Sequence, residues 1–119
     1  MKSAPDAVRE CIELYSRNER PDRELEKAAT KAVTAELVAI APGKAVEFRV
    51  PPHVAVQLVE GPAHRRGTPP ALVELKARDL FDLAVGAISW VELRKSGRLS
   101  ASGERSDLSY LFPCFTLQD

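Results

Sequence analysis

The chain has 119 residues, 29% of them charged, and its 17 basic and 17 acidic side chains cancel. This balance gives no net field that would draw the protein to nucleic acid or to an anionic bilayer. No apolar run approaches the roughly 20 residues of an integral membrane segment, and the polar start lacks the apolar core of a signal peptide. We expect one cytoplasmic domain over residues 1–119, with a helical pair in 1–42 and the sheet and C-terminal helices in 43–119.

Two helices are expected before residue 43. Ser3 and Asp6 resemble a capping box with Pro5 in the first turn, which predicts a helix that begins near residue 4. A second helix is expected from about Asp22 to Ile40. Its apolar residues recur at helical spacing and are predicted to form the buried side: Leu25, Ala29, Ala32, Val33, Leu37 and Ile40.

The pattern then changes to that of strands. Residues 46–50 alternate apolar and charged side chains, which is typical of a strand with one wet face. Pro51 and Pro52 end it, and 53–60 is predicted to be the antiparallel partner strand. Because this partner is more apolar on both sides, we expect it at the centre of the sheet. Residues 71–76 give a third strand after an irregular loop.

Residues 79–97 carry the signals of two short helices. Gly86 and Gly97 each follow a run of helix-forming residues, where a glycine in left-handed conformation would end a helix. Ser89 and Glu92 form an S-x-x-E pattern, which predicts a capping box at the start of the second of these helices.

The remaining residues complete the predicted architecture. Polar and apolar residues alternate over 98–103, which predicts a fourth strand, while Ser106 and Pro113 would begin and end a last short helix. The helices, about five in all, group at both ends of the sequence and are expected to cover one face of the sheet. This arrangement is an α+β fold.

Little in the chain suggests catalysis. His53 and His64 lie eleven residues apart with no carboxylate pair at helical spacing beside either, so no metal site is expected. No G-x-S-x-G pattern surrounds any serine, and no catalytic residue or cofactor is predicted. Cys11 and Cys114 lack C-x-x-C spacing. They are interpreted as structural thiols, with a disulfide or a reactive group as the alternatives.

The loop before residue 71 has one candidate polar site. Arg65, Arg66 and Thr68 could clamp an anion or a lipid head group, because an arginine fork suits carboxylate and phosphate oxygens. The alternative is a solvated turn in which the arginines pair with Glu60 or Glu104. An enzyme that holds an anionic substrate in this loop is the weakest of the functional hypotheses.

Trp90 is the single tryptophan and follows the Ser89 cap. Its ring belongs either to the core or to the wall of an apolar pocket for a ligand. The pocket hypothesis assigns it apolar neighbours on the surrounding elements as further ligand-binding residues: Phe81, Val85, Leu93, Leu108, Leu111 and Phe112.

The C-terminal residues also carry a family resemblance. The run 79–86, the helix after Ser89 and the segment 96–111 resemble the C-terminal half of the sterol carrier protein family, and 46–75 is similar to its small stand-alone bacterial branch. The matching positions are Leu80, Phe81, Leu83, Gly86, Gly97, Arg98, Leu99, Gly103, Leu108 and Leu111. The resemblance implies a mostly antiparallel, four- to five-stranded sheet covered by helices that enclose an apolar tunnel for sterols, fatty acyl chains or phospholipids.

The resemblance favours a non-enzymatic binding or carrier module for a small apolar ligand. The alternative is an accessory domain that forms a homodimer or supports a partner enzyme without binding lipid. An empty pocket of about 300 Å³ would cost ~7 kcal/mol, similar to the stability of a whole domain. Any pocket is therefore expected to be occupied, collapsed or open to solvent.

Overall fold

The computed structural model describes residues 1–61 and 71–118. Within these ranges the elements run in the following order: β1 (Lys2–Ser3), α1 (Asp6–Ser16), α2 (Arg23–Ile40), β2 (Val46–Val50), β3 (Val54–Leu58), β4 (Ala71–Leu75), α3 (Ala77–Ala84), α4 (Trp90–Lys95), β5 (Leu99–Ser102), the 3₁₀ turn η1 (Ser109–Leu111) and β6 (Phe115–Thr116). The predicted α+β class is confirmed.

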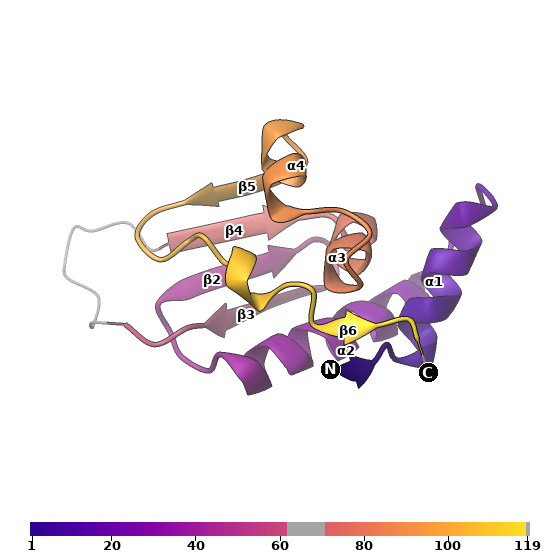
Figure 1. Cartoon of the computed structure of the whole chain (residues 1–119), viewed down its shortest axis with the longest axis horizontal. Helices are drawn as coiled ribbons and strands as arrows, with labels where there is room; N and C mark the ends of the chain where they lie inside the picture. Colours follow the sequence, from indigo (N-terminus) through magenta and orange to yellow (C-terminus); the bar gives the residue numbers. More distant parts are fainter. Residues whose placement is uncertain (62–70, 119) are drawn as a thin grey trace.

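The main sheet has the strand order β3-β2-β4-β5 (Figure 1). β2 pairs with β3 and β4 pairs with β5 in antiparallel fashion, but β2 and β4 are parallel, so the sheet is mixed. The expectation that β3 is central was wrong, because β3 is an edge strand. Ala55 on β3 is small and apolar but exposed, so the apolar character of this strand did not mean that both faces are buried.

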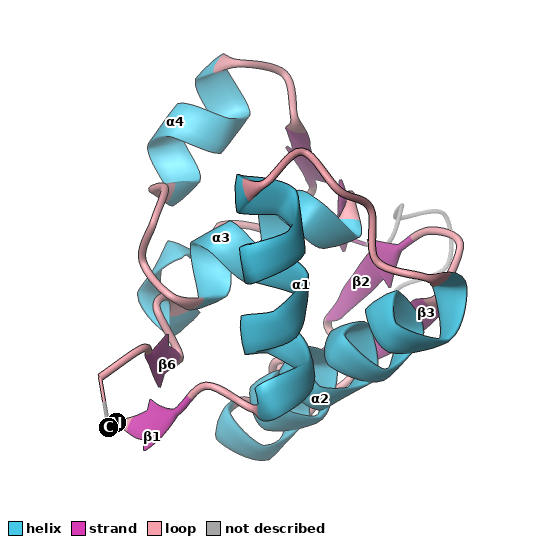
Figure 2. Ribbon diagram, turned by 90° about the vertical axis from the view of Figure 1, so that its right-hand side faces the viewer, coloured by secondary structure: helices cyan, strands magenta, loops and turns pink. Residues whose placement is uncertain are grey.

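The helices lie on one side of the sheet. In Figure 2, α1, α3 and α4 stand on one side of the strands, and α2 runs beneath β3. Alternate residues of β2 point to the helices and are fully buried: Val46, Phe48 and Val50. Residues of the opposite sheet face are exposed, among them Arg49, Gln57, Glu74, Ser100 and Ser102. A sheet with one covered face explains why apolar and polar residues alternate along its strands.

Both predicted N-terminal helices are present, but their ends differ from the expected ones. α1 begins at Asp6, and no side chain caps it, because Ser3 is paired with Thr116 in a small parallel sheet formed by β1 and β6. The predicted capping box is therefore absent, and the helix begins two residues after the expected start near residue 4. Asp22 does cap α2, accepting a hydrogen bond from the Leu25 amide at 2.8 Å. Ile40, predicted to be buried, is 51% exposed, since helical periodicity shows which side faces the core but not how far the core extends.

The predicted signals for α3 and α4 are confirmed. Gly86 and Gly97 adopt φ values of +82° and +76°. The Ser89 hydroxyl accepts from the Glu92 amide, and the Glu92 carboxylate accepts from the Ser89 amide, as the capping box requires.

The last predicted helix is only the 3₁₀ turn η1. The hydroxyl of Ser106 donates to the carbonyl of Gly103 at 2.8 Å, and Leu108, not Ser106, is the N-cap of η1, with no side-chain capping hydrogen bond. After η1 the chain crosses in front of the sheet to β6, beside the N-terminus (Figure 1). The amide of Ala4 donates to the carbonyl of Thr116 at 2.8 Å, which ties the two ends of the chain together.

The turn between α2 and β2 is attached closely to the end of β3. The Val59 amide donates to the Ala41 carbonyl at 2.8 Å, and the Ala45 amide donates to the Val59 carbonyl at 2.9 Å. Gly43 has a φ of +151°, and a Cβ atom at this position would lie 2.1 Å from the carbonyl carbon of Val59. Only a glycine fits between these two backbone segments.

We expect Gly43→Ala to destabilise the protein by about 3 kcal/mol or more, because the clash is with backbone that is hydrogen-bonded on both sides. Gly97→Ala is the matched control, since Gly97 also has a positive φ but no atom lies within 4 Å of its added Cβ. The control should lose only about 1–2 kcal/mol. Urea unfolding measures both, and equal losses would contradict the close backbone approach at Gly43.

Candidate functional site

An open groove of about 370 Å³ lies where the C-terminal end of α3, the start of α4 and the segment after η1 meet. Aromatic and aliphatic side chains form most of its wall, and polar atoms of two serines and a glutamate reach its edge. The lining residues are Leu83, Gly86, Ala87, Ile88, Ser89, Trp90, Val91, Glu92, Ser109, Phe112 and Pro113.

Local hydrogen bonds fix the two aromatic walls of this groove. Trp90 is the first residue of α4 and directly follows the Ser89 cap. The capping box therefore fixes the backbone position from which the indole side chain extends. The Cys114 amide donates to the Ala84 carbonyl at 2.9 Å, which holds the segment after η1 against the end of α3. The rings of Trp90 and Phe112 stack at 6.2 Å with an interplanar angle of 22°. Offset pairs of this kind are stable arrangements for aromatic rings.

The structure separates the predicted ligand-binding residues into two groups. Trp90 and Phe112 line the groove, and Trp90 is at the same time a core residue that is only 5% exposed. The other predicted residues do not line it: Phe81, Leu93, Leu108 and Leu111 are buried in the core, and Val85 is half-buried against it. Their contact with a ligand stays a prediction.

Sequence reasoning missed several groove residues. Ile88 and Val91 stand on either side of the Ser89-Trp90 pair in the sequence, and Pro113 follows Phe112. Val91 is 55% exposed. The sequence signal that could have found them is the presence of two aliphatic residues, Ile88 and Val91, beside the capping box. Helical periodicity alone does not say which side of the short helix these two residues face. Arg65, Arg66 and Thr68 of the predicted head-group loop lie outside the described residues.

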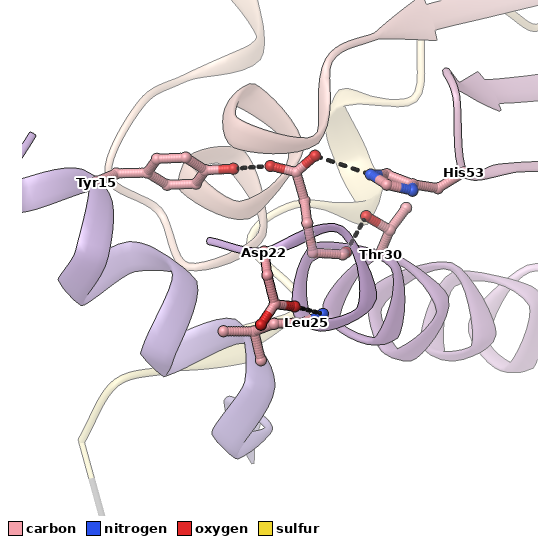
Figure 3. Close-up of polar contacts among 6 residues, drawn as sticks. Tyr15, Asp22, Leu25, Thr30 and His53 are labelled. Carbon is pink, nitrogen blue, oxygen red and sulfur yellow. Dashed lines mark hydrogen bonds and ion pairs between the residues drawn. The ribbon is translucent and has the colours of Figure 1, made fainter. Parts of the chain in front are cut away.

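Apart from the groove, a polar cluster of Tyr15, Glu26 and His53 joins three segments of the chain beside the core (Figure 3). Glu26 of α2 accepts a hydrogen bond from the Tyr15 hydroxyl of α1 and lies 2.8 Å from Nε2 of His53. His53 belongs to the turn between β2 and β3, and its side chain is only 2% exposed. The Tyr15 ring also stacks on Phe81, and the Arg78 guanidinium lies 5.1 Å from its centroid.

The ionisation of this cluster follows from its contacts. Burial raises the pKa of Glu26, but the hydrogen bonds from His53 and Tyr15 outweigh it and hold this pKa below its usual value of 4.5. The pKa of Tyr15 is raised by burial and by the neighbouring Glu26, so its hydroxyl stays protonated and acts as a donor. The cluster connects α1, α2 and the hairpin turn, because Glu26 of α2 contacts both Tyr15 of α1 and His53 of the turn.

The two cysteines are free and buried. Burial, the largest cause, raises the pKa of Cys11 to about 11 and that of Cys114 to about 12, and nearby carboxylates add to it. Thiols with such pKa values carry little thiolate at neutral pH, which fits the structural interpretation and not the reactive one.

Among the residues that the structure describes, no cluster of three or more histidine, cysteine or acidic side chains could hold a metal ion. In the same residues no helix has the length and apolarity to cross a membrane.

Comparison with known proteins gives one family. A family model described as bacterial SCP ortholog matches residues 22–114, well over half of the chain. The matched range includes α2, the whole main sheet, α3, α4 and the groove residues up to Pro113. No curated protein matches the chain.

The Tyr15-Glu26-His53 cluster gives a test of stability against pH. We expect Glu26→Gln to lower the unfolding free energy by about 1–3 kcal/mol near pH 7, because enclosed His53 loses its carboxylate partner. Since the folded pKa of Glu26 is lowered, the carboxylate's contribution is complete above the unfolded pKa and is lost as the pH falls through the folded one. The difference from the unsubstituted protein should therefore shrink below about pH 4.5.

Glu24→Gln is the control for this measurement, because Glu24 lies in the same first turn of α2 and is exposed. Chemical unfolding at a series of pH values measures all three proteins. A loss for Glu24→Gln as large as that for Glu26→Gln, or a Glu26→Gln loss that does not change with pH, would contradict the role given to the cluster.

Proposed function

Since the chain belongs to the bacterial sterol carrier protein ortholog family, we propose that it is a non-enzymatic binding or carrier module for a small apolar ligand such as a lipid, a fatty acyl chain or a sterol-like molecule. The ligand lies in the groove beside Ile88, Trp90 and Phe112. No cofactor takes part, and the module works in the cytoplasm.

The observation that carries the proposal is the stacked Trp90-Phe112 pair in the wall of an open groove. Its volume of about 370 Å³ falls in the range of small-molecule sites. The groove is open to solvent, so it avoids the cost of a large dry cavity. Both aromatic rings are held by hydrogen-bonded backbone, and little ordering is therefore needed when a ligand binds.

The free energy gained by burying methylene groups restricts the class of ligand. Each buried methylene group contributes about 0.8 kcal/mol, and a micromolar dissociation constant corresponds to about 8 kcal/mol. A chain must then bury at least about ten methylene groups to bind at micromolar concentration, and more once the cost of association is included. The proposal therefore predicts weak binding of short acids and stronger binding of long ones.

The accessory-domain alternative has its own observation. Val91 and Tyr110 are 55% and 66% exposed, and Tyr110 lies in η1 between the groove residues Ser109 and Phe112. Exposed apolar side chains around a groove also suit a protein partner or a second copy of this chain. In that case the protein would dimerise, or bind its partner, through the same face without lipid.

We expect Ile88→Asp to weaken the binding of a fluorescent long-chain fatty acid by about tenfold or more, because a charge replaces an apolar wall of the groove. Ile40→Asp is the matched control, since Ile40 is an exposed isoleucine at the end of α2 and does not line the groove. Displacement titration measures both variants, with thermal unfolding to check that each is folded.

Three results would separate the two functions. Saturable binding that falls in Ile88→Asp and not in Ile40→Asp supports the carrier function. No binding, or an equal loss in both variants, contradicts it. If gel filtration then shows a dimer that Ile88→Asp converts to a monomer, the accessory-domain alternative holds instead.

A further inference from the structure

A second hollow, of about 310 Å³, lies at the other end of α3, between its first turn and the end of α1. Basic side chains from two separate elements reach it, Arg20 from the α1–α2 turn and Lys76 and Arg78 from the start of α3. A neighbouring hollow of about 620 Å³ shares Lys76 and Arg78 and continues to Arg98. This region is separate from the apolar groove, so the inference does not depend on the proposed function.

The acidic side chains around this hollow already have partners. Glu26 is engaged by Tyr15 and His53, and Glu19 pairs with Arg17 at 3.4 Å. In the adjoining hollow, Asp79 accepts from the Nε of Arg98 at 3.1 Å. Asp82, one turn after Arg78, is the remaining acid there; burial raises its pKa, while the charges of Arg78 and Arg98 lower it.

The basic side chains are in a different position. Among the described residues, no ion pair joins Arg20, Lys76 or Arg78 to a carboxylate within hydrogen-bond distance, although the charge of Arg20 acts on Glu26 and that of Arg78 acts on Asp82. Arg78 lies over the Tyr15 ring, which fixes its direction but leaves its N–H groups available, because a ring face accepts a cation without using its donors. Lys76 is the N-cap of α3 and makes no side-chain capping hydrogen bond, and Lys76, Ala77 and Arg78 of this helix start all line the hollow.

We propose that this hollow binds a phosphate-type oxyanion between Arg20, Lys76 and Arg78. The arginine forks match two oxygens each, the lysine supplies a compact charge, and the first amides of α3 add donors. The phosphate group can come from a phosphorylated small molecule or from a phospholipid head group. The chemistry is the same for both sources, and they differ only in the apolar part that the phosphate carries.

The test titrates ¹⁵N-labelled protein at low ionic strength with inorganic phosphate and with glycerol 3-phosphate. We expect saturable shifts of the Ala77, Arg78 and Asp79 amide signals. Lys76→Gln and Arg78→Gln should each weaken binding about fivefold, since each removes one charged contact. Lys44→Gln is the matched control, because Lys44 is an exposed lysine in the α2–β2 turn and does not line the hollow.

A second arm identifies the source of the phosphate. Vesicles of phosphatidylcholine with and without phosphatidic acid are sedimented with the same proteins. Saturable amide shifts with the soluble phosphates indicate a phosphorylated small molecule, whereas sedimentation only with phosphatidic acid, reduced in Lys76→Gln and Arg78→Gln, indicates a head group. If neither probe binds, or if Lys44→Gln loses as much affinity as the α3 variants, the proposal is wrong.

Discussion

The structure depends on covering the one apolar face of a four-stranded sheet. Large side chains from the sheet and from the helices fill the space between them, and the largest of these are fully buried: Phe48, Phe81, Leu37, Leu58, Leu80, Leu83, Leu93 and Leu108. Emptying about 300 Å³ of such a core would cost ~7 kcal/mol, as much as a domain of this size has to spare. This constraint favours ligand sites at the rim of the core, where helices end and backbone turns.

α3 connects the two candidate sites. Its C-terminal end, with Gly86 and the carbonyl of Ala84, holds the wall of the apolar groove. Its first turn presents Lys76 and Arg78 to the basic hollow. The middle of the helix is occupied by core residues such as Leu80 and Phe81. One short helix can therefore position an apolar site and a basic, anion-binding site about 12 Å apart, given a rise of about 1.5 Å per residue.

The sequence predicted features that depend on neighbouring residues, and missed those that depend on distant ones. Gly86, Gly97 and the Ser89 capping box could be predicted because each needs only a few adjacent residues. The parallel pairing of β2 with β4, and of β1 with β6, joins segments that local patterns do not relate. Phe81 and Trp90 looked equally suited to a pocket, and tertiary packing alone placed Phe81 under Tyr15 and Trp90 at the groove.

The most direct test of the central claim is a methyl NMR titration with a long-chain fatty acid. The account predicts saturable shifts of the methyl signals of Ile88 and Val91, which line the groove, and unchanged signals for Val46 in the core and Ile40 at the end of α2. Shifts centred on Val46 would place the ligand between the sheet and the helices instead. Such shifts, or no saturable change at any methyl group, would contradict an apolar site at the Trp90-Phe112 groove.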